Sequence, residues 1–392
     1  MFNGEKLTEL RLLYGWTRLE LADKLNITEQ AVWQFETGKT RPKKVPTVLE
    51  LSRLFGVEVS YFENEMEASN IDMRSIAFRN EDNESRKTIQ MQEVYVNKID
   101  SLVKYLESFL ITPDKSIYSL IQKVDTLLKE KQITSSLIKE VADLSREKLA
   151  ISNNNNDLLY RIELSGVNVL SRLIAQGSSA DAYSLWSKDN VPYIVLGIGK
   201  SAVRRNFDLA HELGHLLLHR TVDFESIDKE QHKIKEQEAN LFASELLMPE
   251  EHFRTYFERF VGTKVSQPDN YIELKQYFNV SIQALEYRAY KLGYLSVSQN
   301  SYFFRQIYQK GYKKIEPLDK DIVIKKPGKI VSMIDTILSN NLSDLQSMLY
   351  ELNIRKQFLS NILNIDASFF DRYSEVNEYN NIIKFERTKK KA

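Results

Sequence analysis

Apolar residues recur every three to four positions along most of the chain, which places them on one face of an α-helix. The clearest case is residues 202–218, where Phe207, Ala210 and Leu213 form an apolar side and three leucines follow. We predict a buried helix there. A strand-like apolar run, Pro192–Leu196, comes shortly before it. The pattern predicts a mostly helical chain with few strands.

The N-terminal region shows short helices separated by capping residues and glycines. Thr17 caps a helix over residues 18–25, and Thr28 caps another over residues 29–36, which Gly38 ends. The inner side of this pair is supplied by Ala22, Val32 and Phe35. Two short helices joined by a tight turn form a helix-turn-helix.

Two further segments show helical patterns without recognisable chemistry. Residues 63–132 contain two apolar stripes interrupted at Pro113, and we interpret them as a helical linker region. Residues 299–392 contain three more helical stretches, and a sensory role is one hypothesis for them. The aromatic residues of Tyr302–Tyr312 are more often part of a core than of a binding surface.

Composition narrows the class of protein. The chain has 392 residues with 54 basic and 54 acidic side chains, so its net charge is near zero and excludes few classes of protein. It has no cysteine, which excludes disulfide bonds and thiolate zinc ligands. The first residues lack a signal-peptide core, and no apolar run approaches the roughly 18 residues of a membrane span. We therefore expect a cytoplasmic protein of about two to four domains.

The histidines are concentrated in one region. All five lie between positions 211 and 252, and the first two belong to the sequence HELGH at residues 211–215. Two residues four positions apart share a helix face, so His211 and His215 can offer ring nitrogens to a single ion. Glu212 lies about 100° round the helix, where its carboxylate can reach a water on the metal rather than the metal. The motif is typical of a zinc peptidase.

A catalytic zinc ion needs a third protein ligand and an open fourth position. The next predicted helix offers Glu236 and Glu238, which lie about 200° apart and cannot both face the metal. We favour Glu236, because Asn240 and two alanines share its face and the alanines allow a close approach of the two helices. Asn240 can then hydrogen-bond a ligating histidine.

The other histidines are weaker candidates. His219 lies roughly 12 Å along the helix from His211, too far to share the ion, so a helix-terminal role is favoured. His232 and His252 are interpreted as surface or local hydrogen-bonding residues.

Two stretches, RNFDLAHELGHLLLH from Arg205 and EQEANLFASELLMP from Glu236, resemble the ImmA/IrrE family of bacterial and phage zinc metallopeptidases. The resemblance covers residues 133–298 and implies a mixed α/β domain similar to thermolysin-type peptidases, acting on a repressor-type transcription factor. One departure is Asn206, where the family usually has arginine. The functional residues that the resemblance implies are Zn²⁺ ligands His211, His215 and Glu236, with Glu212 as general base.

Two features of such a site remain open. An extended substrate pairs with an edge strand, and Pro192–Leu196 is the candidate, the alternative being an ordinary core strand. The group that stabilises the oxyanion is not marked by spacing. Its candidates are His232, Tyr193, Arg204 and Arg205.

Residues 1–62 resemble the lambda-repressor-like (Xre) family through Leu21-Ala22, Val32, the stretch FETGK at 35–39 and Pro42. The resemblance implies a double-stranded DNA operator and a recognition helix over residues 29–36. Because a single module binds weakly, we expect a homodimer or pairing with a second repressor. On the base side the expected contacts are Arg18, Thr28, Glu29, Gln30 and Trp33. On the phosphate side they are Lys39, Arg41, Lys43 and Lys44. The alternative is a protein-interaction module on the same fold.

The expected architecture is multidomain and mostly α. It has an all-α helix-turn-helix domain (1–62), a helical linker region (63–132), an α+β zincin-like metallopeptidase domain (133–298) and a helical C-terminal region (299–392). Two functions are compatible with it. One is a DNA-tethered zinc endopeptidase that cleaves a repressor, an antitoxin-like partner or itself in a stress or phage response. The other is a repressor whose zinc domain is a sensor or structural module without turnover. The sequence favours the first, because Glu212 is unnecessary for holding a metal.

Overall fold

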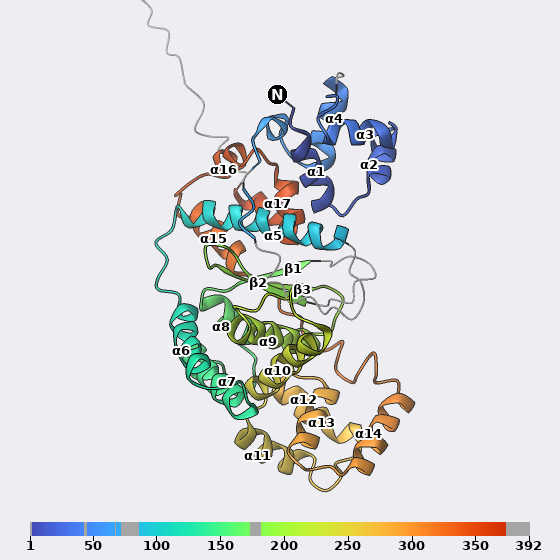
Figure 1. Ribbon diagram of the computed structural model, residues 1–392, viewed down its shortest axis with the longest axis vertical. Helices are drawn as coiled ribbons and strands as arrows, with labels where there is room; N and C mark the ends of the chain where they lie inside the picture. Colours follow the sequence, from blue (N-terminus) through green and yellow to red (C-terminus); the bar gives the residue numbers. More distant parts are fainter. Residues whose placement is uncertain (1, 43–44, 67, 72–85, 173–181, 374–392) are drawn as a thin grey trace, which may run out of the picture. The chain divides into compact units, whose positions relative to one another are not determined.

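A computed structural model describes residues 2–42, 45–66, 68–71, 86–172 and 182–373 (Figure 1). The contacts divide the chain into two compact units. Unit 1 combines residues 1–67, 104–110 and 331–392, and unit 2 combines residues 68–103 and 111–330. Compact units and functional domains need not coincide, so the four-domain division stays a prediction.

Unit 1 begins with the predicted short helices. They are α1 (Gly4–Leu13), α2 (Arg18–Leu25), α3 (Glu29–Glu36) and α4 (Val45–Phe55), followed by the 3₁₀ helix η1 (Val59–Glu63). Thr17 and Glu20 form a capping box, in which the Thr17 hydroxyl accepts the Glu20 N–H and the Glu20 carboxylate accepts the Thr17 N–H. Leu7, Leu21 and Val32 are fully buried between the helices. The predicted helix-turn-helix is therefore present as α2 and α3.

The C-terminal helices belong to the same unit. They are α16 (Leu345–Glu351), α17 (Lys356–Leu363) and η4 (Ala367–Tyr373), preceded by α15 (Lys329–Ser339). Val57 and Ile354 form an isolated antiparallel bridge, and the Arg355 N–H donates to the Gly56 carbonyl at 2.9 Å. The rings of Tyr61 and Phe358 also meet. Long-range packing thus joins the end of the described chain to its beginning.

Unit 2 is built around a three-stranded sheet of β1 (Asn168–Arg172), β2 (Ala182–Trp186) and β3 (Pro192–Gly197). The order is β1-β3-β2, with β3 parallel to β1 and antiparallel to β2. Asn168 pairs with Tyr193, and Ala182 pairs with Leu196. The proposed edge strand Pro192–Leu196 is therefore the central strand, and that prediction is wrong. A fully apolar run is what burial on both sides of a central strand requires.

Helices cover both faces of this sheet (Figure 1). The first part of α5 (Arg86–Glu107) covers one face, where Tyr183 donates to the Gln92 side chain and Tyr193 to the Asp100 carboxylate, both at 2.7 Å. The other face packs on α9 (Ala202–Leu218). The shared core on that side includes Val169, Ile194, Leu196, Leu209, Leu213 and Leu216.

The rest of unit 2 is helical. Its elements are α6 (Ser116–Glu130), α7 (Ser135–Leu149), α8 (Leu158–Leu164), α10 (Lys229–Leu247), α11 (Glu250–Phe260), η3 (Pro268–Tyr271), α12 (Ile272–Phe278), α13 (Ile282–Lys291) and α14 (Val297–Gln309). Helix α10 packs between α9 and α7, and fully buried Ala239 and Ala243 lie on it as expected. No helix among the described residues is long and apolar enough to span a membrane.

Candidate metal centre

Helix α9 presents His211 and His215 on one face. The two side chains lie one turn apart, and both are buried. Their ring centroids are 4.8 Å apart, and the two Nε2 atoms lie 3.1 Å apart. Both rings therefore direct the same nitrogen to one point.

Helix α10 brings a carboxylate to that point. Glu236 Oε1 lies 3.1 Å from His215 Nε2, and its Oε2 lies 3.5 Å from His211 Nε2. Donor atoms of the three side chains all fall within 4.8 Å of one another. Two ligands at 2.0–2.1 Å in a tetrahedral zinc site are about 3.4 Å apart, so the donor set fits zinc in both chemistry and spacing.

Asn240 and Glu238 take different places around this group. Asn240 Oδ1 lies 3.1 Å from His211 Nδ1, the nitrogen on the far side of the ring from Glu236. Glu238 lies outside the group and contacts His219 Nε2 at 2.8 Å and Lys235 Nζ at 3.0 Å. The structure therefore brings Glu236, not Glu238, to the paired histidines.

Glu212 lies beside the donor group without being a member of it. Its side chain is buried, and the Ser184 hydroxyl of β2 donates to its Oε2 at 2.7 Å. Burial raises the pKa of the Glu212 carboxyl to about 7, against the opposing effects of His211 and Ser184. The site thus combines three side chains that could hold a metal ion with a carboxyl group that accepts a hydrogen bond from Ser184.

The outer side of the helix-turn-helix carries the expected polar residues. Thr28, Glu29 and Gln30 are exposed at the start of α3, and Trp33 is half-buried. Lys39 Nζ lies 4.1 Å from the centroid of the Trp33 ring.

The arginines and lysines near α3 are placed differently from one another. Arg18 Nε lies 2.6 Å from buried Glu36 Oε2, so this guanidinium is anchored to α3. Arg41 is exposed. The expected phosphate contacts Lys43 and Lys44 lie outside the described residues.

Comparison with protein families identifies both parts. Residues 163–290 match the peptidase family model described as the IrrE N-terminal-like domain. Residues 7–62 match the helix-turn-helix model. The chain thus combines a region that matches the helix-turn-helix model with a region that matches the IrrE-type peptidase model. Both resemblances seen in the sequence are thereby confirmed, and the comparison with curated proteins gave no match.

Two of the four oxyanion candidates in the peptidase domain point away from the histidines. Tyr193 donates to Asp100 on the α5 face of the sheet. Arg205 donates to the Ser171 hydroxyl at 3.1 Å.

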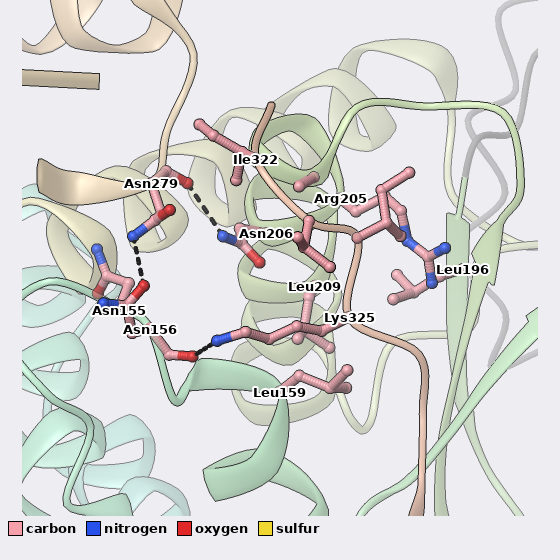
Figure 2. A pocket seen from close by; sticks show the side chains of 13 residues that line it. Asn155, Asn156, Leu159, Leu196, Arg205, Asn206, Leu209, Asn279, Ile322 and Lys325 are labelled. Carbon is pink, nitrogen blue, oxygen red and sulfur yellow. Dashed lines mark hydrogen bonds between the residues drawn. The ribbon is translucent and has the colours of Figure 1, made fainter. Parts of the chain in front are cut away.

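Arg205 also lines a cavity of about 210 Å³ beside the first turns of α9 (Figure 2), whose lining includes none of the three donor residues. Asn206, the departure from the family pattern, donates to the Asn279 carbonyl at the same cavity.

The other two candidates lie on the two helices that carry the donor residues, Arg204 on α9 and His232 on α10. Arg204 donates to the Lys313 carbonyl at 2.9 Å. The ring of His232 lies 5.8 Å from Phe224, whose ring in turn lies 5.8 Å from His215.

Ser184 is the residue that the sequence did not reveal. A serine in a short strand carries no motif, and only the pairing of β2 with β3 places it opposite α9. A weak signal exists, since Ser184 is a single small polar residue within an apolar and aromatic run of five.

Proposed function

We propose that this chain is a DNA-binding regulator whose peptidase domain is a zinc endopeptidase, cleaving a repressor-type transcription factor, another partner or the chain itself in a stress or phage response. The observation that carries the proposal is the convergence of His211, His215 and Glu236 donor atoms, with the Glu212 carboxylate beside them. A closed structural site would use a fourth protein ligand and would need no adjacent carboxylate.

His211, His215 and Glu236 would hold the zinc ion. When bound, zinc lowers the pKa of a coordinated water and polarises a peptide carbonyl. The Asn240 carbonyl faces His211 Nδ1 and so favours a proton on that nitrogen, which leaves Nε2 free of hydrogen for the metal.

Glu212 would act as general base. Its Oε2 accepts the Ser184 hydroxyl, so Oε1 is the oxygen available to take a proton from the attacking water and pass it to the leaving amine. Ser184 positions the carboxylate, since a group with a fixed hydrogen bond keeps one orientation.

The substrate would bind along β2. β2 has one strand partner, β3, and the isolated Ile71–Ser187 bridge lies just after its last residue, so within the described part of the chain the other side of β2 is an edge. An extended peptide can add to such an edge through backbone hydrogen bonds. Ser184 of the same strand contacts Glu212, so this edge runs next to the proposed base.

The helix-turn-helix domain would direct the peptidase to an operator. Exposed Gln30 and half-buried Trp33 on α3 would read base edges, with Lys39 and Arg41 near phosphates. One such module binds weakly, so pairing with a second copy would be needed for a stable complex.

The test is Glu212→Gln, which preserves shape but cannot accept a proton. The zinc-loaded protein is incubated with repressors encoded beside it, and fragments are identified by mass spectrometry. Cleavage should fall by about 10²- to 10⁴-fold while zinc content and operator binding persist. The control is the variant Glu230→Gln, which should cleave normally because Glu230 is exposed at the start of α10.

Equal cleavage by the Glu212→Gln and unmodified proteins would refute the catalytic role of Glu212. Derepression of the neighbouring genes by the Gln variant would favour the alternative, a repressor whose zinc domain senses without turnover.

A further inference from the structure

A chain of side-chain contacts leads away from His215, on the side opposite the proposed metal. His219 Nδ1 lies 2.9 Å from His215 Nδ1, and His219 Nε2 lies 2.8 Å from Glu238 Oε2. The His219 side chain is fully buried, and Lys235 Nζ contacts the same Glu238 oxygen at 3.0 Å. His215 of α9 and Glu238 of α10 are thus connected through His219, the C-cap residue of α9, by two short contacts.

Hydrogen-bond chemistry orders the protons along this chain. A carboxylate can only accept, so His219 Nε2 must carry the proton that faces Glu238. A neutral imidazole with a proton on Nε2 has a lone pair on Nδ1, and His219 Nδ1 therefore accepts from His215. His215 then carries its proton on Nδ1, and its Nε2 keeps the lone pair that faces His211 Nε2 and Glu236.

We infer that His219 and Glu238 are positioning residues that hold His215 in its metal-binding tautomer and orientation; this inference rests on the proposed zinc site. The negative charge of Glu238 also increases, through His219, the electron-donating strength of His215 Nε2. His219 is the C-cap residue of α9, as expected, and its side chain in addition contacts the proposed ligand His215.

The surroundings favour a fixed chain of contacts over a solvated one. Phe224 packs edge-on against both rings, with centroid distances of 5.8 Å to His215 and 6.4 Å to His219. Water is thereby kept from the Nδ1 atoms, and a buried imidazole nitrogen without a partner would be costly. Each proposed histidine ligand consequently has its own orienting partner, Asn240 for His211 and His219 for His215.

Two variants of the same residue separate the two contacts. In His219→Asn the amide oxygen stands near the Nδ1 position and can still accept from His215. In His219→Gln the amide group stands near the Nε2 position, where it can reach Glu238 but leaves His215 Nδ1 without its acceptor. Zinc affinity is measured on the full chain by competition with a chromophoric chelator.

We expect His219→Gln and His219→Ala to lose about 10- to 100-fold in zinc affinity, and His219→Asn to stay within a few-fold of the unmodified protein. Thermal unfolding of the metal-free variants measures any loss of fold separately. Equal affinity losses for the Asn and Gln variants would overturn the inference that His219 positions His215, because packing alone would then account for the losses.

A second readout follows the hydrogen bond between the two histidines. The chain has five histidines, so ¹⁵N-histidine labelling gives five ring spin systems. In the zinc-loaded unmodified protein the His215 Nδ1 proton should exchange slowly with solvent, because it is donated to His219, and in His219→Gln it should exchange faster. Equal exchange rates of this proton in the two proteins would refute the inference.

Different results would refute the proposed zinc site and the positioning role of His219. Full zinc binding by His211→Ala and His215→Ala would refute the site itself. Loss of zinc in those two variants, with unchanged zinc affinity in His219→Gln and His219→Ala, would refute only the positioning role of His219.

Discussion

Gly214, inside the HELGH sequence, sets how closely α9 and α10 approach. A methyl group at this position would lie 2.9 Å from Phe242 Cδ1, 3.2 Å from its Cγ and 3.3 Å from its Cβ. Phe242 is fully buried on α10, the helix that carries Glu236. Gly214→Ala should therefore push α10 away from α9 and weaken zinc binding.

The magnitude follows from the distances. Carbon atoms pack at about 3.5–4.0 Å, so the contact with Phe242 requires a shift of about 0.5–1 Å. Overpacking of this kind costs about 1–3 kcal/mol, against a gain of about 1 kcal/mol from the higher helix propensity of alanine. We expect a net loss of about 1 kcal/mol in unfolding free energy. A displacement of this size at a ligand helix should lower zinc affinity about tenfold or more.

The assay compares zinc affinity and denaturant unfolding for three variants. Gly214→Ala with Phe242→Leu should recover zinc affinity in part, since the smaller side chain makes room. Gly328→Ala is the control, because an added methyl there meets nothing within 4 Å. Unchanged zinc affinity in Gly214→Ala, with an unchanged fold, would refute the claim that this contact sets the ligand spacing.

Three other changes have expected outcomes. Burial raises the pKa of Glu286 to about 7, above its value of 4.5 in the unfolded chain. The contribution of Glu286 to the unfolding free energy is therefore most favourable below pH 4.5 and is lost as the pH rises through 7. Glu286→Gln should therefore stabilise the fold above pH 7 by up to about 3 kcal/mol and flatten the pH profile of chemical unfolding. Glu245→Ala should cost about 3–5 kcal/mol in unfolding free energy, because Glu245 pairs with buried Arg288 at 2.6 Å. A smaller loss would show that water hydrates the Arg288 guanidinium in the variant. Gln30→Ala should cost about 1–3 kcal/mol at the cognate operator and little on random DNA, as measured by fluorescence anisotropy.

Local sequence determined the parts of the site that lie on one helix. The four-residue spacing of His211 and His215 fixes both on one face of α9, whatever the rest of the chain does. The same periodicity separates Glu236 from Glu238 on α10, and the structure places the first at the histidine pair. Capping residues such as Thr17 likewise marked the helix-turn-helix, because their hydrogen bonds are to neighbours in sequence.

Tertiary structure decided what depends on neighbours far away in sequence. The apolar run Pro192–Leu196 indicates a buried strand but does not identify the strands that pair with it, and only pairing with β1 and β2 made it central. Ser184 reaches Glu212, and Glu238 reaches His219, across 28 and 19 positions. Hydrophobic periodicity records which face of an element is buried but not which element buries it, so these partners became visible only in the folded chain.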